Sequence, residues 1–145
     1  MPSDAEITLV GQALASALTV AGDITGYYYT AVPNDLSMGA PCVLVRPTAI
    51  RFDVEADGGA QINYDLAVLA ALTASGIATG AAKLDSYLSR DSAASLLALI
   101  EADSTLGGAC QCAVLSEWAD ARMDYRIDQN GAPHFGALGH VEVQV

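Results

Sequence analysis

The sequence predicts an α+β domain: a mostly antiparallel sheet with long hairpins, and an N-terminal helix and two central helices packed on one side of it. The first observation is the stretch 60–73, AQINYDLAVLAALT. Apolar and polar residues alternate in its first half, and in its second half the residues on both faces of the expected strand are apolar. The second is the alternation at 50–55, joined to this stretch by Asp57-Gly58, a strong hairpin signal. The third is helical spacing of apolar residues in three segments: 4–21, 81–89 and a run ending near 102.

The N-terminal helix has a start signal and a stop signal. Ser3 and Glu6 form a capping box, in which each side chain satisfies an amide that the first turn leaves unpaired. Behind the box, four residues share one helical stripe: Ile7, Val10, Leu14 and Leu18. We expect a helix from Asp4 to Ala21, ended by Gly22.

Two short strands are expected next. The first covers Tyr27–Thr30, with one tyrosine inward and two at a rim or subunit contact. The second covers Cys42–Val45 and ends at Arg46-Pro47, because proline cannot donate to a strand ladder. The hairpin of 50–73 follows.

The centre of the chain predicts a flexible connector at 74–80 and two helices. The first helix, 81–89, places Leu84, Tyr87 and Leu88 on one stripe. The second is capped by Asp91 or Ser92 and ends near Ala102, with Leu96, Leu97 and Ile100 facing inward. The glycines of 104–108 predict a turn after it.

The last third predicts strands. A first strand covers 109–118, with four residues of one parity on the same face: Cys110, Cys112, Val114 and Trp118. A second, 121–127, alternates apolar residues with charges of alternating sign. After an Asn130-Gly131 turn, a final strand from Phe135 to Val145 places Val141, Val143 and Val145 on one face.

Length and composition limit the function classes. We expect one domain, residues 1–145. The net charge of −11 disfavours nucleic-acid binding, which rests on Lys and Arg. With 52% hydrophobic and only 16% charged residues, part of the surface is expected to be covered by other subunits; an Ala-rich soluble monomer is the alternative. No signal peptide or membrane span is recognised, so we expect synthesis in the cytoplasm.

The sequence contains no recognisable catalytic, cofactor or metal motif. The glycines at 76 and 80 lack the spacing of a phosphate loop, and Lys83 comes three residues after the second glycine instead of directly after it. Three cysteines favour reduced, buried thiols over disulfides or a zinc site. His134 and His140 are expected to be surface or rim histidines, and an enzyme is disfavoured.

The second half of the chain contains AAKLDSYLSR, DSAASLLALIEAD, STLGG and a closing GHVEVQV. This succession resembles tail terminator proteins of long-tailed, siphovirus-type phages, notably those that infect actinobacteria. The most specific part is SAASLLALIEADSTLGG, and the N-terminal helix with its proline-containing extended segment agrees with the same architecture. The Cys110/Cys112 pair and the three adjacent tyrosines depart from the pattern.

The resemblance implies a virion protein that forms a homo-oligomeric ring, a hexamer in expectation. Such a ring caps the tube of major tail protein, ends its elongation and presents a surface to the head-completion (stopper) protein. It would be assembled in the host cytoplasm and would let genomic DNA pass without specific binding, since an acidic lumen repels phosphate. Two alternatives remain. The first is another phage neck or head-tail connector (stopper) protein, or a tail-tube protein. The second is a small-molecule-binding or enzymatic domain.

If copies join through strands, two charged faces and the charge-free 74–80 segment are the candidate subunit interfaces. The seven charged residues are Arg51, Asp53, Glu55, Arg122, Asp124, Arg126 and Asp128. A solvated edge with cross-strand ion pairs is the simpler interpretation of the 122–128 charges.

Overall fold

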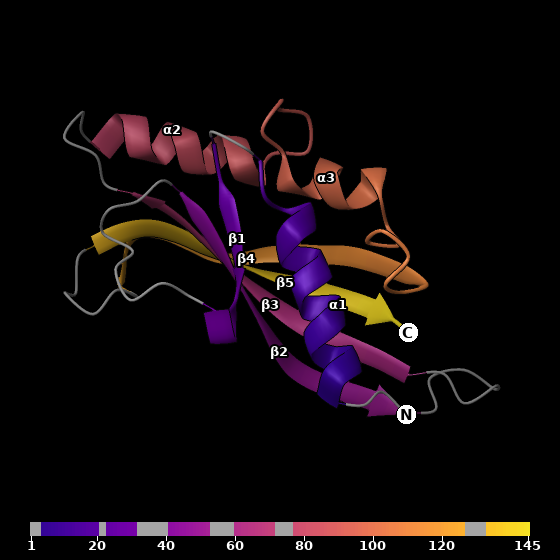
Figure 1. Ribbon diagram of the computed structural model, residues 1–145. Helices are drawn as coiled ribbons and strands as arrows, with labels where there is room; N and C mark the ends of the chain where they lie inside the picture. The colour runs from indigo at the N-terminus through magenta and orange to yellow at the C-terminus, as the bar shows by residue number, and fades with distance from the viewer. Residues whose placement is uncertain (1–3, 21–22, 32–40, 53–59, 72–76, 127–132) are drawn as a thin grey trace.

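The computed structural model describes residues 4–20, 23–31, 41–52, 60–71, 77–126 and 133–145. These residues form an α+β domain, as predicted, with helices packed against a mostly antiparallel sheet (Figure 1). The helices are α1 (Asp4–Ala17), α2 (Ile77–Leu88) and α3 (Leu96–Ala102), with a 3-10 turn η1 (Tyr29–Ala31). The strands are β1 (Thr25–Tyr28), β2 (Cys42–Phe52), β3 (Ala60–Ala71), β4 (Cys112–Arg126) and β5 (Pro133–Gln144).

The sheet has the strand order β1-β2-β3-β5-β4, with the predicted hairpin of β2 and β3 near its middle. β1 runs parallel to β2, and every other neighbouring pair is antiparallel. β3 is paired along its length on both sides, with β2 on one and β5 on the other. This explains why its sequence pattern was the clearest in the chain.

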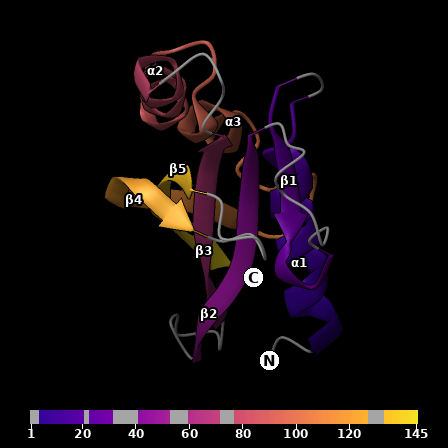
Figure 2. The same ribbon diagram turned by 90° about the vertical axis from the view of Figure 1, so that its left-hand side faces the viewer.

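A single apolar core joins the helices to one face of the sheet. Alternate residues of β3 (Ile62, Tyr64, Leu66 and Val68) have no exposed surface. They belong to the same cluster as buried residues of all three helices, among them Leu14, Tyr87 and Ile100. α1 contacts β1 and β2, α2 contacts β3 and β5, and α3 contacts β4 (Figure 2).

Helix α1 is shorter than predicted, ending at Ala17 instead of Ala21. The reason lies in the residues that follow. The Thr19 hydroxyl donates to Ala15 O at 3.0 Å and accepts from Gly26 N at 2.8 Å. Val20 then pairs with Ile24 in an isolated bridge, so the chain turns back one helical turn early. Ser3, half of the predicted capping box, lies outside the described residues.

Strand β2 is one strand where two were predicted. The prediction ended the first strand at Arg46-Pro47, but β2 continues to Phe52 through a register shift between Pro47 and Ala49. Proline is tolerated because the described part of β1 pairs with β2 only from Cys42 to Val45. Beyond that point no described strand lies on this side of β2, and at such an edge a missing N–H is not costly.

Strand β4 is likewise one long strand where two were predicted. It carries three register irregularities. The first lies between Leu115 and Glu117, and after it the even-numbered instead of the odd-numbered residues face the core. Ala113 and Leu115 are buried and Val114 is 51% exposed, whereas Trp118 packs against the core. The predicted common face of Val114 and Trp118 is therefore wrong, because the bulge lies between them.

The remaining elements exist as predicted but with shifted bounds: β1 ends at Tyr28 instead of Thr30, because the chain turns into η1, and the ends of α2 and β5 differ from the prediction by one residue. α2 begins at Ile77, within the segment predicted to be a connector, and α3 is capped by Ser95 instead of Asp91 or Ser92. Gly107 and Gly108 have positive φ in the predicted turn. Tyr28 is the buried tyrosine and Tyr29 is half exposed; Val141 and Val143 of β5 are buried, as predicted.

Candidate functional site

The charged residues predicted as subunit interfaces lie at opposite edges of the sheet. Arg51 has an exposed side chain near the end of β2. Arg122, Asp124 and Arg126 belong to β4, which β3 and β5 separate from β2. Asp53, Glu55 and Asp128 lie outside the described residues, as do 74–76 of the predicted connector. Within one copy, the two charged sets are therefore not brought together.

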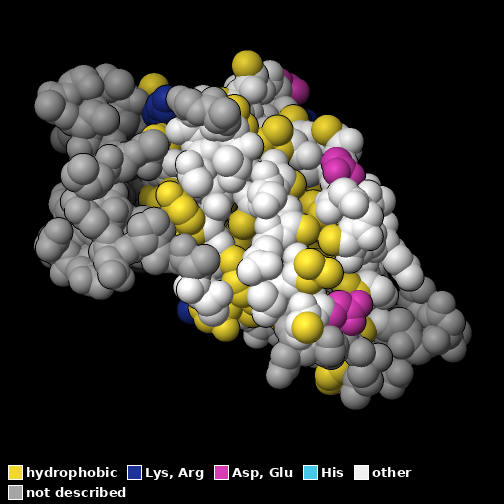
Figure 3. All heavy atoms as spheres, viewed as in Figure 1, with side chains coloured by type: hydrophobic (Ala, Val, Ile, Leu, Met, Phe, Trp, Pro, Cys, Tyr) yellow, Lys and Arg dark blue, Asp and Glu magenta, His cyan; other side chains and the backbone are white. Residues whose placement is uncertain are grey.

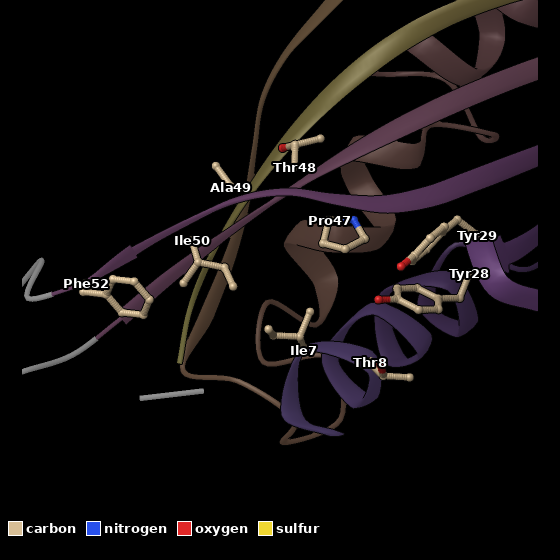
Figure 4. A pocket seen from close by; sticks show the side chains of 9 residues that line it. All are labelled: Ile7, Thr8, Tyr28, Tyr29, Pro47, Thr48, Ala49, Ile50 and Phe52. Atoms are coloured by element: carbon tan, nitrogen blue, oxygen red, sulfur yellow. The ribbon is translucent and has the colours of Figure 1, made fainter. Parts of the chain in front are cut away.

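A groove of about 600 Å³ lies between the first half of α1 and the second half of β2 (Figure 4). Ile7 from the helix and Ile50 and Phe52 from the strand point toward it, and Tyr28 and Tyr29 close one end. Phe52 is 51% and Tyr29 50% exposed, which is unusual for such large side chains in a chain with only two phenylalanines. The full lining is Ile7, Thr8, Tyr28, Tyr29, Pro47, Thr48, Ala49, Ile50 and Phe52.

The groove exists because β1 is short. After Tyr28 the chain turns into η1 and leaves β2, so residues 46–52 of β2 have no described strand on their outer side. The ring of Tyr28 packs edge-on against that of Tyr29, with centroids 5.0 Å apart. Burial raises the pKa of Tyr28, although a hydrogen bond with Thr8 opposes the shift. The hydroxyl therefore stays neutral at physiological pH and the end of the groove carries no charge.

The helix wall of the groove is held to the sheet by a buried tyrosine. The Tyr64 hydroxyl donates to Ile7 O at 2.6 Å, and Tyr64 has no exposed surface. Burial raises its pKa, so the phenol remains a donor throughout the ordinary pH range. This bond fixes Ile7, and with it one wall of the groove, relative to β3.

The opposite face of the sheet carries a row of charged groups across four strands. His140 Nδ1 lies 2.8 Å from Asp65 Oδ1, and His140 Nε2 lies 3.6 Å from Glu117. Arg46 extends the row, with Nη2 3.9 Å from Asp65 Oδ2. These are cross-strand pairs of the kind that stabilise a solvated face. His140 is about one-third exposed and lies on β5, between β3 and β4, which is a surface position and not a rim; the prediction had left both open.

The thiols do not form a reactive centre. All three cysteines are free. Burial raises the pKa of Cys42 to about 11, and burial together with the neighbouring Cys112 and Asp103 raises that of Cys110 to about 11. Thiols are nucleophiles and metal ligands as thiolates, and these two are protonated at neutral pH.

The described residues contain neither a metal-binding cluster nor a membrane-spanning helix. Over those ranges, there is no cluster of three or more His, Cys, Asp or Glu side chains arranged to hold a metal ion. No helix in the same ranges combines the length and the apolar character that crossing a membrane requires.

Sequence reasoning found one part of the groove and missed the rest. The tyrosine run was expected at a rim or subunit contact, and Tyr29 does lie at the groove rim. Phe52, Ile50 and Ile7 were assigned only to regular elements, because their convergence depends on where β1 ends. In the space-filling view of the α1 side, apolar side chains are scattered among white backbone and uncharged polar atoms, and few charged side chains are seen among the described residues (Figure 3).

No protein-family model matches this chain. A search of curated proteins likewise finds no match.

Proposed function

We propose that this protein is a structural virion protein of a long-tailed phage. Copies of it form a ring, six in the expected form, that caps the tube of major tail protein and ends its elongation. The ring then forms the tail-side surface of the head-tail junction and binds the head-completion protein. In this role the protein acts by surface complementarity and catalyses no reaction.

The observation that carries the proposal is the groove beside residues 46–52 of β2, which have no strand partner on their outer side among the described residues. Two half-exposed aromatic side chains, Phe52 and Tyr29, lie next to the outer edge of β2. Exposed aromatic groups beside strand edges that lack a partner are typical of surfaces that a second protein covers. The tail-terminator resemblance of residues 92–108 then supplies the kind of assembly.

The charge of the chain supports the same role. Seventeen acidic residues against six basic ones give a net charge of −11, too acidic for a protein that grips DNA. A ring of such chains has a phosphate-repelling surface along which DNA slides without binding. The acidic groups on the open sheet face, Asp65 and Glu117, are held by His140.

A nonsense mutation in the gene, in the phage that encodes the chain, tests the proposal. Electron microscopy of the lysate is expected to show overlong, uncapped tails that are not joined to heads, and a plasmid copy of the gene restores normal particles. Tails of normal length accompanied by heads that lose DNA would instead identify a stopper or other neck protein. Normal virions would exclude both roles.

A second measurement separates the proposal from a small-molecule-binding domain. Light scattering of the purified protein is expected to detect self-association, or self-association only when tail tubes are added. A protein that stays monomeric with tubes present and binds a metabolite in the groove would contradict the proposal.

A further inference from the structure

The stretch of β2 from 46 to 52, which no described strand pairs on its outer side, carries different side chains on its two faces. Ile50 and Phe52 point to the groove, on the helix side of the sheet (Figure 4). Arg51 lies between them in the chain and so points to the opposite face. Arg46 lies on that face too, because the β3 residues opposite Arg46 and Arg51 have the same parity. A chain lying along this edge therefore meets an apolar wall on one side and two arginines on the other.

Arg51 lacks the acidic partner that the other described cations have. The structure describes the side chains of four basic residues: Arg46, Arg51, Lys83 and Arg90. Lys83 and Arg90 each have a carboxylate oxygen within 3.3 Å, and Arg46 has one at 3.9 Å. Arg51 is exposed and forms no ion pair with the described residues. In a chain with 17 acidic and 6 basic residues, a cation without a carboxylate beside it is a place for an acidic group from outside.

We propose that residues 46–52 and the groove bind an extended segment of a partner protein in which apolar residues alternate with acidic ones. The segment adds to the outer edge of β2 as a further strand. Since successive side chains of a strand point to opposite faces, its apolar residues enter the groove and its carboxylates lie beside Arg46 and Arg51. The inference deepens the proposed function and rests on it, because it states the chemistry by which the ring recognises a partner.

Side-chain burial provides most of the affinity, because the edge is short. Pro47 has no N–H, and the register shift after it leaves Ala49–Phe52 as the regular part of the edge. Phe52 and Tyr29 are half exposed, and docking of the segment removes their apolar surface from water. The two arginines contribute less, because exposed ion pairs are weak, but they select an acidic segment over a neutral or basic one.

Charge disfavours the simplest rival occupant, the β2 edge of a second copy. Residues 46–52 contain Arg46 and Arg51 and no acidic residue. Antiparallel pairing of two such edges about their centre brings Arg46 of one copy opposite Arg51 of the other, which is destabilising.

The net charge of −11 opposes an acidic segment only at a distance. At physiological salt, charges more than about 8 Å apart are largely screened. None of the described residues that line the groove is acidic, so the nearest charges that the segment meets are those of the arginines.

The test uses the full-length protein and a synthetic peptide of alternating valine and glutamate, about ten residues long. Isotope-labelled protein is titrated with the peptide, and the backbone amide signals are followed by nuclear magnetic resonance. Saturable shifts are expected at residues 46–52 and in the first half of α1. A peptide of alternating valine and lysine, and one with the same valines and glutamates in two blocks, are each expected to bind at least about tenfold more weakly.

A charge-reversal variant and its matched control assign the acidic specificity. Arg51→Glu is expected to weaken binding of the valine–glutamate peptide at least about fivefold at low salt and less at high salt, and to strengthen binding of the valine–lysine peptide. Arg90→Glu changes the net charge by the same amount at an exposed position outside the groove. Its effect is expected to stay within about twofold.

A second pair of variants assigns the apolar wall. Phe52→Ser is expected to weaken binding of the valine–glutamate peptide about tenfold. Leu9→Ser is the control, since Leu9 is 60% exposed on α1 but does not line the groove.

The inference is overturned by absence of saturable binding, by equal binding of the glutamate and lysine peptides, or by equal effects of Arg51→Glu and Arg90→Glu. Shifts of the signals of 46–52 that depend on protein concentration alone would identify a second copy as the occupant and overturn it as well. Such results leave tail capping intact, because that function is measured by tail length in the phage. Conversely, normal tails after a nonsense mutation contradict the proposed function even where the peptide binds.

Discussion

The hydroxyl of Tyr87 donates a 2.6 Å hydrogen bond to Oδ1 of Asp23, 64 residues away in sequence. The same Asp23 oxygen lies 3.2 Å from Nζ of Lys83. Tyr87 and Lys83 belong to α2, and Asp23 lies in the turn between α1 and β1. These contacts join two parts of the domain that the sheet alone does not connect.

Replacing Tyr87 with phenylalanine is expected to lower the free energy of unfolding by about 1.5 kcal/mol, because a buried phenol loses a bond to a carboxylate. Urea denaturation at pH 7 measures the loss. Tyr29→Phe is the control, since Tyr29 is half exposed and its change is expected to stay within about 0.5 kcal/mol.

The effect of Tyr87→Phe is expected to depend on pH. The hydrogen bond from Tyr87, followed by Lys83, lowers the pKa of Asp23 below its ordinary 3.8, although burial opposes them. A carboxyl group with a lowered pKa stabilises the fold above the unfolded value, and this contribution disappears as pH falls through the folded value. The difference between wild type and Tyr87→Phe should thus be constant between about pH 5 and pH 9 and shrink below pH 3.8. A difference that grows in acid would contradict the assignment.

Gly26→Ala is expected to destabilise the protein by about 3 kcal/mol. A Cβ atom at this position would lie 2.1 Å from the backbone oxygen of Ala15, and a helix backbone cannot move aside as a side chain can. Thermal and urea unfolding measure the effect. Thr30→Ala, at an exposed position of η1, serves as the control, and equal stability of the two variants would refute the close contact.

Ser95→Ala is expected to cost about 1 kcal/mol, the usual loss when a helix N-cap is removed. Ser95 is 2% exposed, and its hydroxyl accepts from Ala98 N at 3.2 Å. Asp91→Ala removes one of the two caps that the sequence predicted, Asp91 or Ser92, and the Asp91 side chain is exposed. We expect a change below about 0.5 kcal/mol for Asp91→Ala in the same denaturation assay. The reverse order would show that Asp91 is the cap.

The thiols of Cys42 and Cys110 are expected to react slowly with a disulfide reagent at pH 8. With pKa values of about 11, only about one thiol in a thousand is ionised at that pH. The rate at Cys110 should rise about tenfold per pH unit, and that at Cys42, which is 5% exposed, should also be limited by opening of the fold. Cys110→Ala and Cys42→Ala assign the two rates, and denaturant should release all three thiols. Fast reaction of Cys42 at pH 7 would contradict its burial.

The sequence predicts correctly the strands that have other strands paired along their length, because the pattern of buried and exposed residues is then regular. Residues 60–73 reveal the central strand because β3 has partners on both sides, and its alternation records which face is buried. The valines of β5 reveal their strand for the same reason. In these elements local pattern and tertiary environment agree.

The predictions that failed concern breaks within strands. Pro47 and the interval 119–120 were taken as strand breaks, but among the described residues both lie on edges, where a proline or a bulge costs little. Whether a strand is an edge depends on how far its neighbour extends, which no local pattern specifies. The groove was unpredictable for this reason, since it begins where β1 ends at Tyr28.

The groove has one wall from the N-terminal helix and one from β2, and the Tyr64–Ile7 bond holds the first wall in place. A chain whose helix α1 has not packed on the sheet accordingly lacks the groove. If a partner protein binds through it, only folded subunits would be bound, and no separate factor would be needed to exclude unfolded ones.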